Sequence, residues 1–196
     1  MSDTSASLLE ILRDRPDDLH WRRLVELYSP LIRYWLSRHT LPAADADDLV
    51  QEVLAVVVRR MPEFHRQERT GAFRAWLRAI TANCLRDFWR AKRIRPQATG
   101  ASDFQAMLDQ LHDSSSGLSR QWDEEHDRFV TQRLLETLRP DFNEKTWRAF
   151  RAVAIEGRPP DEVAQELNLT VNAVFIAKSR VLSRLRQEAK GLVEEV

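Results

Sequence analysis

Apolar residues recur at helical spacing along most of the chain, in stretches separated by polar or proline-containing breaks. Between residues 18 and 39 they follow steps of three, one and three, which places them on one face of an α-helix. Pro30 is expected to bend this helix or divide it into two pieces. Similar stripes predict two further helices, over residues 45–60 and 72–93.

The pattern changes after residue 94. Residues 95–120 are rich in Gly, Ser and Asp, include the run 114–117 of three serines and a glycine, and carry only a short apolar pattern. Helical stripes then resume, and the helices they predict cover residues 122–138, 143–156, 160–167 and 171–188. We therefore predict an all-α protein of two small helical domains, 1–94 and 121–196, joined by a flexible linker, 95–120, with at most one brief helix.

Composition supports the helical prediction and removes several classes of site. Five glycines among 196 residues are too few to favour glycine-rich phosphate loops. The single cysteine, Cys84, allows no internal disulfide and no cysteine-rich metal site, and its place on the apolar stripe predicts a core position. We expect no membrane insertion, because no apolar run approaches about 18 residues, and no export signal, so the expected location is the cytoplasm.

The net charge is zero, with 30 basic and 30 acidic residues, but the charges are unevenly distributed. Residues 97–141 carry 4 basic and 9 acidic groups, so an acidic segment separates two parts of the chain in which basic residues cluster. Such local fields matter more to a polyanion than the sum does.

Residues 161–180 have the pattern of a helix-turn-helix. Val163, Ala164 and Leu167 are expected to pack against the next helix, which Thr170 is suited to cap. From residue 170 to residue 187 there are four basic residues and no acidic one, so this helix can enter a groove lined with phosphates. The alternative for this segment alone is a helical hairpin whose basic residues only keep it soluble. The residues assigned to DNA here are Thr170, Asn172, Ala173, Lys178 and Arg180.

Within this last helix, Asn172 is the candidate for a directional contact, bidentate to adenine, because the N-terminal residues of a recognition helix meet base edges. Arg180 can serve guanine or phosphate. Phe175 and Ile176 fall outside the buried stripe, and they either pack on the preceding helix or contact thymine methyl groups.

The helix over 72–93 carries arginines at steps of about four, opposite its apolar stripe. Trp89 lies beside Arg86, and an aromatic ring among arginines suits single-stranded or melting DNA, because the ring can stack on an unpaired base. A solvated charged face is the alternative. The residues assigned to DNA on this ridge are Arg74, Arg78, Arg86, Trp89 and Arg90.

The helix over 45–60 carries a polar stripe that includes Asp48, Gln51 and Glu52. An acidic stripe does not bind DNA, so it is either solvent surface or a contact with a basic protein partner.

Taken together, three motifs in this order resemble the extracytoplasmic-function (ECF) group of bacterial RNA polymerase sigma factors. They are Asp-Ala-Asp-Asp-Leu-Val-Gln-Glu-Val at 45–53, Phe-Arg-Ala-Trp-Leu-Arg-Ala-Ile-Thr-Ala-Asn at 73–83 with Asp87 and Arg90, and the C-terminal helix-turn-helix. The resemblance spans residues 21–93 and 122–186. In the recognition helix, the run 172–177 is less polar than is common in the group. The resemblance therefore does not imply which promoter sequence this chain recognises.

The resemblance implies that the first domain, region two, binds core RNA polymerase and opens the minus-ten element of the promoter. It places Asp48, Gln51 and Glu52 at the polymerase contact, and the loop 63–71 and the helix 73–90 at the separated strand. The second domain, region four, would bind the minus-thirty-five element through its last helix. The implied partners are core polymerase and promoter DNA, with an anti-sigma factor as a further candidate.

Two other classes of function share some of these features. A helix-turn-helix regulator that does not act through core polymerase would share the last helix and the basic ridge, but it leaves the stripe around Asp48 without a role. An enzyme would need clustered ligands or a nucleophile with its base. The five histidines are scattered, with no pair at metal-ligand spacing, and each is expected at the surface or half-buried. We expect no catalytic residue, no metal and no cofactor.

Overall fold

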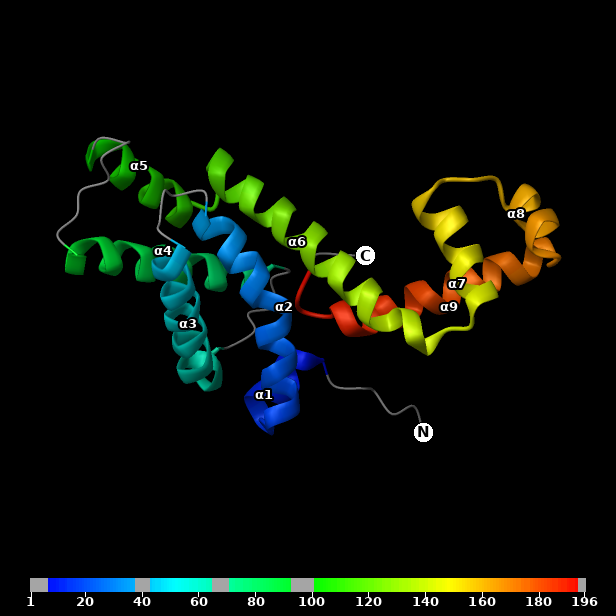
Figure 1. The fold of residues 1–196 in the computed structure, drawn as a ribbon, viewed down its shortest axis with the longest axis horizontal. Coiled ribbons are helices and arrows are strands. Elements are labelled where there is room, and N and C mark those ends of the chain that lie inside the picture. The colour runs from blue at the N-terminus through cyan, green and yellow to red at the C-terminus, as the bar shows by residue number, and fades with distance from the viewer. Residues whose placement is uncertain (1–6, 38–42, 65–70, 93–100, 194–196) are drawn as a thin grey trace. The chain divides into compact units, whose positions relative to one another are not determined.

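The computed structural model describes residues 7–37, 43–64, 71–92 and 101–193, and within these ranges it contains nine α-helices and no β-strand. Only coiled ribbons are visible in Figure 1. The all-α prediction is confirmed. Contacts divide the chain into two compact units, residues 1–130 with 191–194, and residues 131–190 with 195–196.

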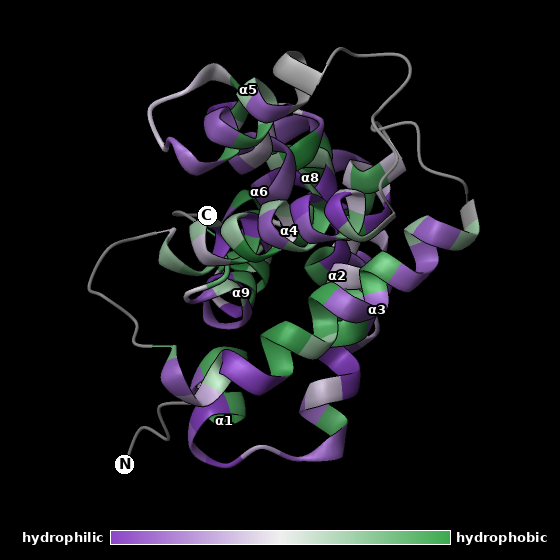
Figure 2. Ribbon diagram, turned by 90° about the vertical axis from the view of Figure 1, so that its left-hand side faces the viewer, coloured by the Kyte–Doolittle hydropathy of each residue, from purple (hydrophilic) through white to green (hydrophobic). Residues whose placement is uncertain are grey.

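The first unit is a bundle in which α3 packs against both α2 and α4, while α5 packs on α4. Figure 2 shows short hydrophobic runs interrupted by hydrophilic residues along α3, as expected for a helix with one buried face. Its helices are α1 (Leu8–Asp14), α2 (Asp18–Ser37), α3 (Ala43–Arg60), α4 (Ala72–Lys92), α5 (Ala101–His112) and the first part of α6 (Gly117–Leu138).

Helix α2 runs through Pro30 as one element, so the alternative that this proline divides the helix is wrong. A proline inside a helix costs about 3 kcal/mol. The apolar stripe continues on both sides of it, with Tyr28, Leu31 and Ile32 almost completely buried. Packing of both halves of the helix against the same core offsets that cost.

Residues 101–130 are part of the first unit, whereas the sequence predicted a linker up to residue 120. Helix α5 occupies much of the expected linker, and α6 begins at Gly117 rather than at residue 122. Residues 93–100 lie outside the described part of the chain. The physical reason is burial: apolar side chains of these two helices complete the core of the first unit. They include Leu108, Leu111, Trp122 and Val130.

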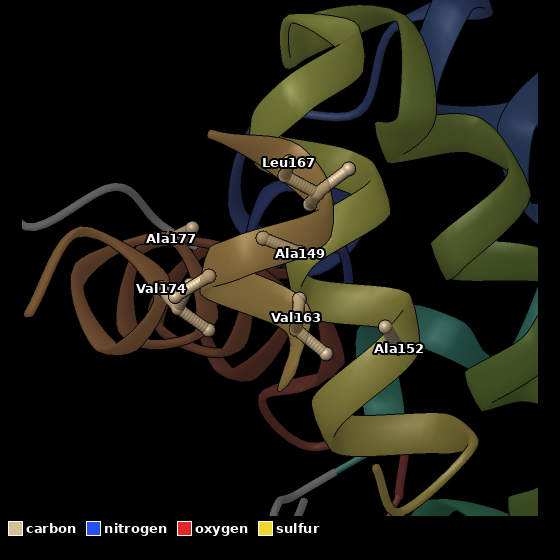
Figure 3. Packing of buried hydrophobic residues seen from close by; sticks show 7 residues of the cluster. Ala149, Ala152, Val163, Leu167, Val174 and Ala177 are labelled. Atoms are coloured by element: carbon tan, nitrogen blue, oxygen red, sulfur yellow. The ribbon is translucent and has the colours of Figure 1, made fainter. Parts of the chain in front are cut away.

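The second unit contains the segment predicted as a helix-turn-helix and has a small core of its own. The helices of this unit are α7 (Glu144–Phe150), a π-helical turn (Arg151–Ile155), α8 (Pro160–Leu167) and α9 (Val171–Ala189). Figure 3 shows the side chains of the core gathered between these elements. The buried residues of this cluster are Ala149, Ala152, Val163, Ala164, Leu167, Val174 and Ala177.

Candidate nucleic-acid interface

The turn between α8 and α9 is three residues long, from Asn168 to Thr170, a length typical of helix-turn-helix motifs. Asn168 adopts a left-handed conformation, with φ of 51°, and ends α8. Asparagine is one of the few residues other than glycine that tolerate this region. The hydroxyl of Thr170 accepts a hydrogen bond of 3.1 Å from the backbone N–H of Ala173, so Thr170 caps α9 as predicted.

The assigned residues of α9 lie on its accessible side. Thr170, Asn172 and Arg180 are exposed, and Ala173 and Lys178 are half-buried. The side chain of Arg184, one turn beyond Arg180, contacts acidic groups, with N···O distances of 2.8 Å to Glu188 and 3.9 Å to Asp141. Glu188 lies in the last turn of α9 and Asp141 in the turn before α7, so acidic groups accompany the C-terminal half of α9 and not its N-terminal half.

Phe175 and Ile176 are exposed on α9, by 51% and 44%. Neither side chain is part of the buried core, and Ile176 lines a surface hollow together with Leu169 and residues of α7. The buried face of α9 is formed instead by Val174, Ala177 and Val181.

Arg74 and Arg78 are buried, so the exposed basic ridge predicted on α4 is incomplete. Arg74 pairs with Asp127, and Arg78 pairs with Asp123, both from α6. Because α6 covers this side of α4, two arginines that a helical wheel places on a polar face become internal. A helical wheel does not distinguish a solvated charge from one that another helix neutralises.

The Arg78 guanidinium also binds two backbone carbonyls. Its Nε donates to the carbonyl oxygen of Leu111 at 3.0 Å, and its Nη1 donates to that of Ser119 at 3.3 Å. One side chain therefore connects α4 to the end of α5 and the start of α6. The fork-shaped donor geometry of arginine makes three such contacts from a single group feasible.

The remaining members of the ridge lie further along α4. Arg86 is half-buried and its Nη2 donates to the side-chain oxygen of Asn83 at 2.5 Å, while Arg90 is exposed. The ring of Trp89 is half-buried and packs edge-on against Phe88, with centroids 5.6 Å apart. The accessible arginines of α4 thus lie in its C-terminal part with Trp89, while the half-buried Trp76 lies nearer the start of the helix.

Asp48, Gln51 and Glu52 are all exposed on one side of α3. The opposite side of this helix is buried, with Leu49, Val53 and Val57 in the core. The helix therefore holds the three polar side chains at the surface on a rigid element, as an interface contact requires.

His126 is completely buried, which corrects the expectation of a surface or half-buried histidine. Its Nδ1 lies 2.8 Å from Oδ1 of Asp127, and its Nε2 lies 3.3 Å from the hydroxyl of Tyr28. A neutral ring that donates from Nδ1 to the carboxylate and accepts at Nε2 from the phenol satisfies both contacts. Burial lowers the pKa of His126 and outweighs the opposing effect of Asp127, while burial raises that of Tyr28.

This burial predicts that mild acid destabilises the protein. His126 stays neutral in the folded chain, whereas the unfolded chain takes up a proton below about pH 6.5, so stability is lost as the pH falls below that value. The loss approaches about 1.4 kcal/mol per pH unit for this one group. Urea unfolding at pH 7.5 and 5.5 measures it, with His126→Gln expected to lessen the pH dependence. His20→Gln is the control, because His20 is only partly buried, and an unchanged slope in His126→Gln would contradict the assignment.

Cys84 is buried, as its place on the apolar stripe predicted, and burial raises its pKa to about 11. Among the described residues, no group of three or more His, Cys, Asp or Glu side chains is placed to hold a metal ion. None of the described helices has the length and apolarity needed to cross a membrane.

Comparison with known proteins identifies the first unit. Residues 24–94 match the family model of sigma-70 region 2. Residues 24–94 thus form a sigma-70 region 2 domain. The resemblance found in the sequence is confirmed.

Two relatives extend the comparison beyond this domain, each 29% identical to the chain. The "ECF RNA polymerase sigma factor ShbA" of Streptomyces griseus subsp. griseus matches over 171 residues, 85% of this chain and 85% of that protein. The "Probable RNA polymerase sigma factor RfaY" of Xanthomonas campestris pv. campestris matches over 149 residues, 76% of this chain. The chain spans only 35% of the length of the second relative.

Proposed function

We propose that this chain is an ECF-type sigma factor that binds core RNA polymerase and directs it to promoters. The observation that carries the proposal is the combination, in one chain, of a sigma-70 region 2 domain and a helix-turn-helix in a separate compact unit. A regulator that acts without polymerase accounts for the second feature but not for the first.

In this proposal the exposed stripe of α3 binds polymerase. Asp48 and Glu52 supply negative charge, and Gln51 supplies a neutral hydrogen-bonding group, on a helix whose other side is anchored in the core. A complementary basic partner surface would be drawn to this stripe by its charge, with an effect on association rate that salt screens.

The minus-ten element is assigned to the accessible part of α4. Arg86 and Arg90 would contact phosphates there, and the ring of Trp89 would assist strand opening by stacking on an unpaired base. Arg74 and Arg78 are not part of this surface, because both are enclosed by α6. The minus-thirty-five element is assigned to α9, which would lie in the major groove with its N-terminal residues at the base edges.

The proposal is tested by transcription from a genomic library with core polymerase and the purified chain. Core polymerase alone should give no promoter-specific transcripts, and addition of the chain should give a set that shares two upstream sequence elements. Absence of specific transcripts, or DNA binding that proceeds identically without polymerase, would support the regulator instead.

The proposed polymerase contact on α3 can be tested with a pair of charge-reversal variants. The double variant Asp48→Lys with Glu52→Lys should bind core polymerase at least tenfold more weakly at low salt, about 1.4 kcal/mol, because like charges then oppose the partner. The control is Asp109→Lys with Glu124→Lys, which makes the same change in net charge at two exposed acidic residues elsewhere on the first unit. Thermal unfolding should show that both variants are folded. Equal affinities of the two folded variants for core polymerase would mean that the α3 stripe is not part of the interface.

A further inference from the structure

The outward side of α9 combines apolar and amide side chains. With 100° between successive residues, the side opposite the buried stripe is centred on Asn172 and Ser179. Phe175 and Ile176 flank this centre on either side, and both are exposed. One amide therefore stands between two large apolar side chains on the part of the helix that points away from its own core.

Phe175 and Ile176 are not part of the buried core of the second unit. The buried cluster under α9 is completed by Val174 and Ala177 with residues of α7, the π-helical turn and α8 (Figure 3). Leaving large apolar side chains in water forgoes burial free energy of about 25 cal/mol per Å² of apolar surface. An exposed apolar pair at the centre of a helix face is typical of a contact surface.

The surrounding charges favour DNA as the occupant. Residues 170–187 carry no acidic group, and the exposed Arg180 and half-buried Lys178 border the pair. Beside Ile176, α7 adds one acidic and one basic residue, Glu144 and Lys145, which leaves the local charge unchanged. Cations at the border with apolar and amide groups at the centre match the major groove, where phosphates line the edges and bases form the floor. The apolar feature of that floor is the C5 methyl group of thymine.

We propose that Phe175 and Ile176 read thymine methyl groups in the upstream promoter element, so that this element is specified at thymines. The inference rests on the proposed function, which places α9 in the major groove. Asn172, between the two apolar residues, is then positioned to bind an adenine edge of the same A·T-containing stretch. Arg180 and Lys178 fix the register through phosphates and carry little sequence information.

The test removes the methyl groups without changing base pairing. Promoter DNA recovered with the holoenzyme is prepared with uracil in place of each thymine of the upstream element in turn, and holoenzyme affinity is measured. A methyl group buried by Phe175 or Ile176 contributes about 0.8 kcal/mol, so its loss should weaken binding about fourfold. Thymines outside the contact should show no change.

Protein variants are combined with the uracil substitutions in a double-mutant cycle. Phe175→Ala and Ile176→Ala should weaken binding to thymine-containing DNA and should no longer distinguish thymine from uracil at one position each. Alanine preserves the helix, since it has the highest helix propensity. Ile155→Ala is the control, because Ile155 is an exposed apolar residue of the same unit that lies outside α9, and it should keep the full thymine preference.

The outcomes separate the inference from the proposed function. Promoter-specific transcription with no effect of uracil anywhere in the upstream element would overturn the inference and leave the function intact. Alanine variants that bind DNA like the wild type would also overturn it, and would indicate a protein as the occupant of this surface. Failure of the holoenzyme to recognise any promoter would overturn both.

Discussion

Replacing Arg78 by alanine is expected to lower the free energy of unfolding by about 3–5 kcal/mol. The side chain of Arg78 is only 3% exposed, and it is the partner of Asp123 and of two backbone carbonyls. Its removal takes one donor from the Asp123 carboxylate and from each of two carbonyl oxygens, and leaves Asp123 with only the longer contact of 3.4 Å to Arg74. A buried polar group that loses a hydrogen-bond partner destabilises the folded state.

Urea unfolding measures this effect, and the chain offers a matched control on the same helix. Arg90 carries the same charge on α4, but its side chain is 73% exposed, so Arg90→Ala should change stability by no more than about 0.5 kcal/mol. Arg78→Lys should rescue only part of the loss, because one ammonium does not reproduce the fork of the guanidinium. Similar stabilities of Arg78→Ala and Arg90→Ala would mean that α6 leaves α4 accessible in solution, and the DNA assignment of Arg78 would be restored.

The second large effect is expected at Trp122, whose replacement by alanine should cost about 3–5 kcal/mol. This side chain is 1% exposed and packs against Trp35 of α2, with ring centroids 4.4 Å apart. If residues 101–130 belong to the first domain, the loss should appear as faster hydrogen exchange in α2 and α4. The exposed neighbour Gln121 is the control, since Gln121→Ala removes no core contact. Unchanged hydrogen-exchange rates in α2 and α4 would indicate that residues 101–130 are a linker and not part of the first domain.

Helices with a single continuous apolar stripe could be predicted from the sequence, because such a stripe occurs where one side of a helix is buried. Helix α3 was expected from residue 45 and begins at Ala43. Helix α1 was missed although a signal was present: Ser7 and Glu10 form a capping box, a pattern readable three residues apart. Helix α5 was expected only as one brief helix within a linker, because serine and glycine around it indicated a linker.

Those features of the candidate site that depend on neighbouring residues in the sequence could be predicted. Thr170 could be identified as a cap because the cap depends on local sequence. The burial of Arg74 and Arg78 could not, because it depends on Asp123 and Asp127, which are about fifty residues away in sequence. The two arginines are four residues apart in the sequence, and so are the two aspartates. This shared spacing does not indicate which arginine contacts which aspartate. Nor does it reveal that His126, beside Asp127, is internal.

The state of Cys84 limits how an environmental signal can reach this chain. A thiol with a pKa of about 11 is ionised in only about one molecule in ten thousand at pH 7, and the thiolate is the form that peroxides and disulfides attack. Cys84 is the sole cysteine in the sequence, so the chain lacks a thiol poised to sense oxidants directly. For the experimenter, the same property means that a cysteine introduced at the surface can carry a probe while the native thiol stays unmodified.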